Sequence, residues 1–592
     1  MTPRPSVYEK ATTSPQVIRP DGVLSQPVLV CLLTLTILAV IGFLYFKETF
    51  TPLKGLFIAL IIPITFAGAH PAQRLGLRED DSTNKQRIDN DFASAILVAK
   101  DNYAGEVDLN RITKASILGM LHTLDPHSNY FDPKEWEKVQ QDQRSRYTGI
   151  GSTIAQRNDK VYIMSPFDGT PAHRGGIRYG DQIIEINGES TEGWTSQQVS
   201  QKLLGPEGTP VTVKVARLGS SQPVEFKFVR EAVRLDSVTN YYMAGSGIGY
   251  INFDRGFNFT SYDEVRTALA DLQKQGMTSL ILDLRSNPGG LVDQAKKITN
   301  LFLYRGQAIV TLRGRPQVLP AKEETATNTT PEEFPIVVLI NSRSASASEI
   351  VAGALQDHDR AVIVGENSFG KGLVQSVFPL SDGSGLWLVT GHFYTPSGRM
   401  IQREYSNRSF YDYYLKRGDK DAIQRTETKR TDTGRTVYGG GGIQPDVVVK
   451  FPSHEIELQR TWVEPVFQFA RSLVAGQIAG LPEFKIDATV NHRHRLAKSD
   501  YPVGDKVIAA FKTFLRAHKE PKADETRVDK DADWLGRRIR YEVATAAFGE
   551  ENARAALADG DVQLQRAIGE APRAKALADD FRRLRATGGT RR

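Results

Sequence analysis

The 592-residue chain has 75 Lys and Arg against 69 Asp and Glu, so its net charge of +6 is small for its length. It holds neither a basic stripe nor a nucleic-acid-binding motif, which argues against an interaction with nucleic acid. Its single cysteine, Cys31, lies in an apolar run, which excludes an intramolecular disulfide and, in the rest of the chain, a cysteine zinc site or a thiol nucleophile.

The first 75 residues are expected to form a membrane anchor or signal region. Residues 27–46 carry no charge and are long enough to cross a bilayer as a helix, and basic residues before them favour a cytoplasmic N-terminus. A second apolar run, 55–69, is short for a span and ends in Ala-Gly-Ala, like a signal-peptide core with its cleavage site. One span would export the remaining chain and two would return it to the cytoplasm; the short second run favours export.

Residues 76–146 are expected to form a helical N-terminal domain. Apolar residues three and four apart predict two helices between about 86 and 122. The segment LDPHSNYFDP, residues 124–133, then ends this block with two Asp-Pro turns.

A small β-domain is predicted at 147–233, where short strands alternate with glycine-rich turns around one helix-like stretch, TSQQVSQKLLG. This order resembles a PDZ domain, with Gly149, Ile150 and Gly151 at the loop that receives a peptide carboxylate. In such domains an extended peptide adds to a sheet edge while backbone N–H groups bind its terminus. The alternative is a β-domain that serves only as a spacer.

Residues 234–455 alternate strands and helices, which predicts an α/β core. The apolar runs SLILDL and PIVVLI are typical of strands that are buried on both faces. After it, 456–592 is polar and helical in pattern, and we expect a helical C-terminal extension with a flexible tail whose role the sequence does not indicate.

Ser346 lies in the segment NSRSASASE, directly after the apolar strand PIVVLI. A serine at a strand-to-helix junction has free backbone N–H groups and the helix dipole beside it, and both can stabilise an oxyanion. The alternative is structural, because Ser346 and Glu349 also match the capping box S-x-x-E.

Lys371 stands between glycines in GENSFGKGLVQ, just after the buried strand AVIVG. Desolvation there would lower the pKa of the lysine and leave a neutral amine that can deprotonate a serine. Gln375, four residues later, could orient that amine. The alternative is an ordinary lysine in a surface loop.

The same segment nearly matches a phosphate-binding P-loop, with Asp283 as its magnesium-binding partner. Gly372 replaces the Ser or Thr that would hold magnesium, the following LVQSVFPL predicts a strand rather than a helix, and Asp283 precedes the loop instead of following it. Nucleotide hydrolysis is therefore not expected.

Gly289 and Gly290 follow the strand that ends at Asp283, and they let the backbone approach a ligand closely. An amide here could complete an oxyanion hole, although a tight turn explains them as well. A Ser-His-Asp arrangement is less well supported, because His358 and His392 belong to no recognisable motif, and there is no H-E-x-x-H for a metalloprotease.

Taken in order, the motifs resemble the C-terminal processing (tail-specific) peptidases over about 86–450: LDPHSNY, the PDZ-like domain, DLRSNPGG, SASASE, FGKGLVQ, FYTPSGRMIQ and GGIQPDVVV. The resemblance implies a crotonase-like core with Ser346 as nucleophile, Lys371 as base and Gln375 supporting it. It implies oxyanion donors at the amides of Ala347 and Gly289. The charged, Tyr-rich insert 407–437 and the extension beyond 455 depart from the family pattern and put substrate access in question, but not this pair.

The sequence therefore predicts a membrane-tethered serine endopeptidase that captures protein C-termini and needs no metal or nucleotide. Its substrates would be proteins with accessible C-termini, and an adaptor protein or a homo-oligomer is compatible with the resemblance. We expect a bacterial inner-membrane location with the catalytic domain facing the periplasm or cell exterior. The rival hypothesis is a catalytically silent protein that only binds tails.

Overall fold

The computed structural model describes residues 81–143, 146–405, 413, 427–518 and 525–586. The chain divides into two units, Met1–Met120 and Leu121–Arg592, which we treat separately. In the first unit the described residues form α3 (Asp81–Asn102) and most of α4 (Leu109–His122). The two helices predicted between 86 and 122 are thus confirmed.

The predicted membrane region cannot be compared with the structure. Both apolar runs, 27–46 and 55–69, lie outside the described residues. Within the described ranges, every helix is too short or too polar to traverse a bilayer.

The second unit begins with a loop, the short strand β1 (Asn129–Phe131) and helix α5 (Pro133–Gln143). A β-domain follows, whose main sheet has the order β3-β4-β5-β7-β8 with β6 added at β5, while β2 pairs with β9. Its elements are β2 (Arg146–Gly149), β3 (Ser152–Arg157), β4 (Lys160–Pro166), α6 (Pro171–Gly175), β5 (Gln182–Ile186), β6 (Glu189–Ser190), α7 (Ser196–Leu203), β7 (Pro210–Ala216), β8 (Val224–Val229) and β9 (Glu231–Arg234). The predicted helix TSQQVSQKLLG is α7, which begins at a capping box between Thr195 and Gln198.

The α/β core is a sheet in the order β10-β11-β12-β15-β16-β21, parallel except for β10. Its strands are β10 (Asn240–Gly245), β11 (Ile248–Asn252), β12 (Ser279–Asp283), β15 (Ile336–Ile340), β16 (Ala361–Gly365) and β21 (Val447–Val448). All five residues of β15 and β16 are buried. This confirms the prediction that the apolar runs form strands covered on both faces.

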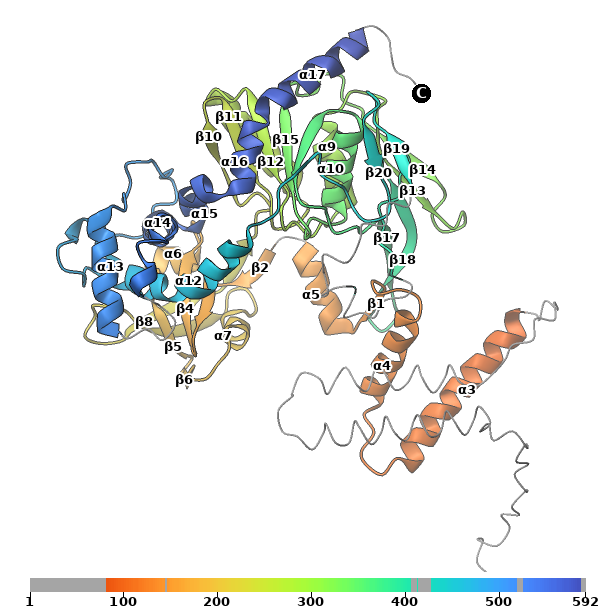
Figure 1. The fold of residues 1–592 in the computed structure, drawn as a ribbon. Helices are drawn as coiled ribbons and strands as arrows, with labels where there is room; N and C mark the ends of the chain where they lie inside the picture. Colours follow the sequence, from red (N-terminus) through yellow and green to blue (C-terminus); the bar gives the residue numbers. More distant parts are fainter. Residues whose placement is uncertain (1–80, 144–145, 406–412, 414–426, 519–524, 587–592) are drawn as a thin grey trace, which may run out of the picture. The chain divides into compact units, whose positions relative to one another are not determined.

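Different parts of the chain cover the two faces of this sheet (Figure 1). One face packs on α8 (Ser261–Lys274), α9 (Val292–Asn300) and α10 (Ala347–Asp357). The other packs on α16 (Val562–Gly569) and α17 (Ala571–Ala586) of the C-terminal extension. The last helices of the extension therefore complete the core.

A second sheet is antiparallel and has the order β1-β18-β13-β14, with β17 paired to β18; its strands alternate along the chain with those of the core sheet. It contains β13 (Ala308–Gly314), β14 (Lys322–Thr325), β17 (Leu373–Pro379) and β18 (Gly385–Tyr394), and the small hairpin β19 (Thr428–Arg430) and β20 (Thr436–Tyr438) follows in the chain. The segment LVQSVFPL forms β17, a strand, as predicted. This removes the helix that a P-loop would require.

The rest of the extension forms a helical layer against the β-domain. Its core gathers aromatic side chains around Trp462 and Phe467 and includes Tyr162 and Tyr179 from the β-domain. The elements are α12 (Ser453–Val474), α13 (Asp505–His518), α14 (Ala532–Phe548) and α15 (Glu550–Ala553), with short 3-10 turns at Pro482–Phe484, Glu525–Arg527 and Arg554–Gly560.

Candidate active site

Ser346 occupies a strained turn at the start of α10. Its φ of 55° and ψ of −115° lie in a region that non-glycine residues rarely adopt, which costs of order 1–3 kcal/mol. Neighbouring loops hold the turn: Ala345 N–H donates to Asn287 O at 3.0 Å, and Ser344 Oγ donates to Leu284 O at 2.7 Å. Strain that is held in place in this way marks a serine whose position matters for more than the helix end.

Glu349 joins the serine turn to the lysine loop. Its fully buried carboxylate accepts the N–H groups of Ser346 (2.8 Å), Gly370 (2.7 Å) and Lys371 (2.8 Å), and also the hydroxyl of Ser368. The bond from Ser346 N–H to the Glu349 carboxylate is one of the two bonds of the capping box that the sequence predicts as an alternative role. The N–H of Glu349 donates to the Ser346 carbonyl. Burial raises the pKa of Glu349, and these four donors oppose the rise.

Lys371 points its amine at Gln375. Its Nζ donates to Gln375 Oε1 at 2.7 Å, and Gln375 Nε2 donates in turn to His127 O at 2.8 Å. Burial lowers the pKa of Lys371, while Glu349 and then Asp125 act in the opposite direction. The orienting contact expected for Gln375 is present, and the direction of the pKa shift is the one a general base needs.

The segment Asp125–Ser128 supports this site, a role that the sequence did not indicate. The Asp125 carboxylate accepts the N–H groups of His127 (2.7 Å) and Ser128 (2.6 Å), which presents the His127 carbonyl to Gln375. Burial, followed by the nearby charge of Lys371, lowers the pKa of His127 to about 4, against the opposing effect of Asp125. The sequence signal for this segment is the LDPHSNY motif, whose residue types alone do not indicate its role.

Both predicted oxyanion donors lie beside Ser346. A Cβ on Gly289 would come within 2.7 Å of Ser346 Cβ and 2.9 Å of Ala347 N, so only glycine allows this approach. Ala347 N–H belongs to the first turn of α10, where N–H groups lack an intrahelical acceptor. The N–H of Gly289, however, donates to Asn287 Oδ1 at 2.9 Å, so it would have to leave that partner to bind an oxyanion.

Asp283 has a structural role. Its carboxylate accepts the hydroxyl of Tyr250 at 2.7 Å and the guanidinium of Arg285 at 2.6 Å, and Arg285 continues to Asp561 of the extension at 2.7 Å. Paired in this way, the Asp283 carboxylate connects the core to the extension through Arg285. It is therefore not the magnesium ligand that a P-loop site would need.

His358 and His392, the two core histidines considered as alternative bases, differ in their surroundings. His358 bonds Asp432 through Nδ1 and Ala308 O through Nε2, both at 2.7 Å, so both ring nitrogens already have partners. His392 lies on β18, where burial lowers its pKa.

Gly149, Ile150 and Gly151 belong to the β-domain rather than to this cluster. Ile150 O accepts Ala172 N–H at 2.8 Å and Gly151 O accepts Phe167 N–H at 2.9 Å. Because C=O and N–H of a trans peptide point in opposite directions, the N–H groups that follow these carbonyls face away from the 167–172 turn. Gly151 has φ of +80° and no room for a Cβ against Thr170, so this loop shape requires glycine.

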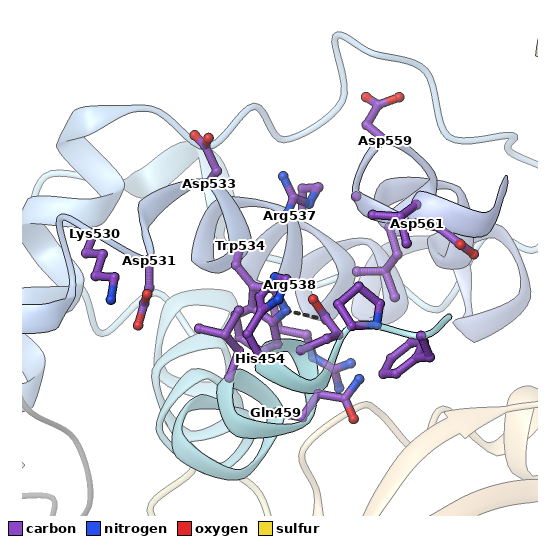
Figure 2. Close-up of a pocket in the computed structure, with 17 residues that line it drawn as sticks. His454, Gln459, Lys530, Asp531, Asp533, Trp534, Arg537, Arg538, Asp559 and Asp561 are labelled. Atoms are coloured by element: carbon purple, nitrogen blue, oxygen red, sulfur yellow. Dashed lines mark hydrogen bonds between the residues drawn. The ribbon is translucent and has the colours of Figure 1, made fainter. Parts of the chain in front are cut away.

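A cavity of about 600 Å³ lies elsewhere, within the C-terminal extension (Figure 2). Acidic and basic side chains are mixed on its walls, among them Asp531, Arg537 and Asp561, and neither Ser346 nor Lys371 lines it. The candidate chemistry is therefore not in this cavity.

Comparison with known families defines the class of protein first. Residues 247–407 match the model of peptidase family S41, and residues 139–216 match the model of the PDZ domain. The β-domain is thus a PDZ domain and the α/β core a serine-type peptidase domain.

Known relatives then define the family. A carboxy-terminal-processing protease of Bartonella bacilliformis is 37% identical over 335 residues, which cover 56% of this chain and 76% of that protein. A Staphylococcus aureus protein named "Probable CtpA-like serine protease" is 33% identical over 327 residues, 55% of this chain and 64% of that one. A solved photosystem II D1 C-terminal processing protease is 26% identical, with a TM-score of 0.32, over 60% of this chain and 86% of that one. The chain belongs to the carboxy-terminal-processing proteases of peptidase family S41.

Proposed function

We propose that this chain is an endopeptidase that binds protein C-termini through its PDZ domain and cuts near the tail with a Ser346–Lys371 dyad. One observation carries the proposal: the backbone N–H groups of a strained serine at a helix N-terminus and of a partly buried lysine bond the same oxygen of Glu349. Nucleophile, base and helix N-terminus are the parts that acyl transfer needs.

In this mechanism the neutral amine of Lys371 takes the Ser346 hydroxyl proton as Oγ attacks the scissile carbonyl. The N–H of Ala347, joined by that of Gly289 once it leaves Asn287, binds the oxyanion. Lys371 then gives its proton to the leaving amine, which leaves an acyl-enzyme on Ser346. Water, deprotonated by the same amine, hydrolyses the ester and frees the serine.

Lys371 and Ser346 also have to approach each other for this step, because in the described residues the amine bonds Gln375 and makes no hydrogen bond to the Ser346 side chain. We extend the proposal to a resting form in which the Lys371 amine lies out of reach of Ser346 and tail binding at the PDZ domain brings the two together. Equal cleavage rates for a substrate with a free C-terminus and for the same substrate with an amidated C-terminus would contradict this gating.

The proposal is tested with an unstructured protein that ends in apolar residues, incubated with the full chain and analysed by mass spectrometry. Wild type should cut near the tail, and Ser346→Ala and Lys371→Arg should not, because arginine keeps the charge but cannot act as a base. Ser376→Ala and Lys297→Ala are the controls and should cut normally. Cleavage by Lys371→Arg would refute the dyad, and no cleavage by wild type, with or without a cell extract, would favour a silent tail-binding protein.

We further propose a bacterial inner-membrane location with the peptidase outside the cytoplasm. The support is the sequence alone: the apolar run 27–46 with basic residues before it, and the short second run at 55–69. Protease added to intact spheroplasts should digest an epitope inserted after residue 592. An epitope that is digested only after lysis would place the domain in the cytoplasm.

A further inference from the structure

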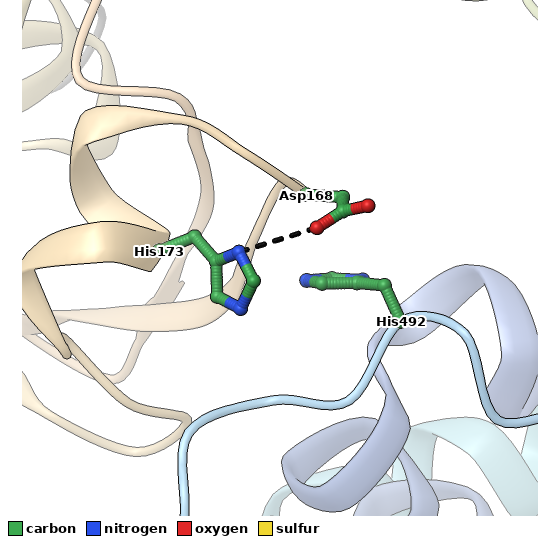
Figure 3. Close-up of side chains that lie close together, drawn as sticks. All are labelled: Asp168, His173 and His492. Atoms are coloured by element: carbon green, nitrogen blue, oxygen red, sulfur yellow. Dashed lines mark ion pairs between the residues drawn. The ribbon is translucent and has the colours of Figure 1, made fainter.

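Three metal-binding side chains meet where the PDZ domain contacts the C-terminal extension (Figure 3). Asp168 and His173 come from the turn and helix after β4, and His492 comes from the loop before α13. Their ligand atoms all lie within 4.8 Å of one another. This cluster is separate from the proposed catalytic residues.

The pair Asp168 and His173 already has the spacing of two zinc ligands. His173 Nδ1 lies 3.3 Å from Asp168 Oδ1. Two ligands at about 2.0–2.1 Å from a tetrahedral Zn²⁺ are themselves about 3.3 Å apart. A metal ion can therefore bridge this pair without moving either side chain far.

His173 is also oriented as a metal ligand usually is. Its other nitrogen, Nε2, lies 2.9 Å from the carbonyl of Val490, which places the proton on Nε2 and leaves Nδ1 as an acceptor. The N–H of Gly169 donates to Nδ1 at 3.1 Å, a hydrogen bond that a metal ion would replace. A carbonyl that fixes the second nitrogen is the usual outer partner of a ligating histidine.

His492 supplies the third ligand. Among the residues that the structure describes, its Nε2 is buried and has no hydrogen-bond partner. Figure 3 shows the far end of the His492 ring directed toward Asp168 and His173. Its Nδ1 lies against Gly549, where an added Cβ would come within 2.6 Å of that nitrogen. A buried nitrogen without a partner costs free energy, which a metal bond would recover.

The cluster is open to solvent on one side, because the side chain of Asp168 is 62% exposed and that of His173 21%. This gives an ion an entry path and leaves room for water as a fourth ligand.

We propose that Asp168, His173 and His492 form a site for a divalent transition metal such as Zn²⁺, which fastens the PDZ domain to the C-terminal extension. The two histidines and one carboxylate suit Zn²⁺, and Cu²⁺ or Ni²⁺ would also bind such a set. Since the ligands come from both parts, binding stabilises their contact and raises the melting temperature.

The test uses the full chain, stripped with a chelator and titrated with Zn²⁺ in a calorimeter. Wild type should bind one Zn²⁺ more per chain than His492→Gln or Asp168→Asn, and Zn²⁺ should raise the melting temperature of wild type alone. His454→Ala removes an exposed histidine elsewhere and should behave as wild type. Co²⁺ in place of Zn²⁺ should give the visible absorption of a tetrahedral site only when both histidines are present.

Equal Zn²⁺ stoichiometry in wild type and in a folded Asp168→Asn variant would overturn the proposal, and so would a Zn²⁺-induced melting shift that survives in that variant. Asp168 is on an exposed turn, so this variant keeps the test decisive even where His492→Gln fails to fold. Folding of each metal-free variant is checked by circular dichroism.

Discussion

The carboxylate of Glu349 accepts the backbone N–H of Lys371 at 2.8 Å, and through the same oxygen it holds the N–H of Ser346. Two loops that are 25 positions apart in the sequence are thereby tied at one buried atom. The carboxylate therefore sets the geometry between the proposed nucleophile and base without touching the substrate.

Glu349→Gln should lower kcat by about 10²-fold or more, because a displacement near 1 Å at a catalytic pair has that effect. A neutral amide offers one oxygen where the carboxylate serves four donors, so buried N–H groups lose their acceptor. Steady-state kinetics on a peptide substrate measure the loss.

Glu323→Gln makes the same chemical change at an exposed position on β14 and serves as the control. Unchanged kcat in Glu349→Gln, with the protein folded, would show that the carboxylate does not set the geometry of the dyad.

The pH profile should reveal Lys371 as the base. Burial lowers its pKa below the ordinary 10.5, so the folded state disfavours the protonated amine. The neutral amine therefore increases as pH rises through that lowered pKa, and kcat/KM should rise with it and level off above. Because the pKa of Lys371 is lower in the folded state than in the unfolded chain, the unfolded chain binds the proton more readily, and the free energy of unfolding should decrease as pH falls below 10.5.

Gln375→Glu should shift the rise of kcat/KM to higher pH by about one to three units, because a carboxylate beside the Lys371 amine favours the charged form of the amine. Gln375→Met removes both hydrogen bonds of Gln375 without adding charge, so it should lower kcat/KM without shifting the pH at which kcat/KM rises. If that pH is unchanged in Gln375→Glu, another group is the base.

Much of the core could be predicted because its patterns are local. The run that forms β15 is apolar along its whole length, and the run that forms β12 is apolar at its centre, Leu280–Leu282, which is typical of strands buried on both faces. The glycines beside Ser346 and Lys371 likewise reported close backbone approaches. Motifs at strand ends therefore predicted both the core strands and the candidate site residues next to them.

Other features depend on contacts between distant segments, which no local pattern contains. The sequence did not indicate that Asp125 would orient His127 under Gln375, 248 positions away from that histidine. Nor did it indicate that α16 and α17 would cover the core sheet, because the apolar residues of a helix do not show which distant segment they pack against.

The role of the extension in the core can be tested on α16. Leu564 is buried against the sheet, together with Ile281 and Val337, whereas Val562 on the same helix is 44% exposed. Leu564→Asp should destabilise the protein by about 3 kcal/mol or more, since it buries an unpaired charge, and Val562→Asp by about 0.5 kcal/mol at most. Equal melting temperatures for the two variants would show that the helix is not part of the folded core.

The strain at Ser346 gives a final prediction. Glycine adopts φ of 55° without the clash that other residues meet, so Ser346→Gly should be more stable than Ser346→Ala by about 1 kcal/mol. Both variants lack the hydroxyl and should be inactive, which separates the stability effect from catalysis.

The matched pair at Ser348, two residues along in α10, should show the opposite order. There the backbone is helical, so Ser348→Ala should be more stable than Ser348→Gly by about 0.5–1 kcal/mol. Denaturant unfolding of the four variants gives the comparison. If alanine is the better residue at both positions, the turn at Ser346 stores no strain; if the order reverses between them, the fold gives up stability to hold the serine at the helix N-terminus.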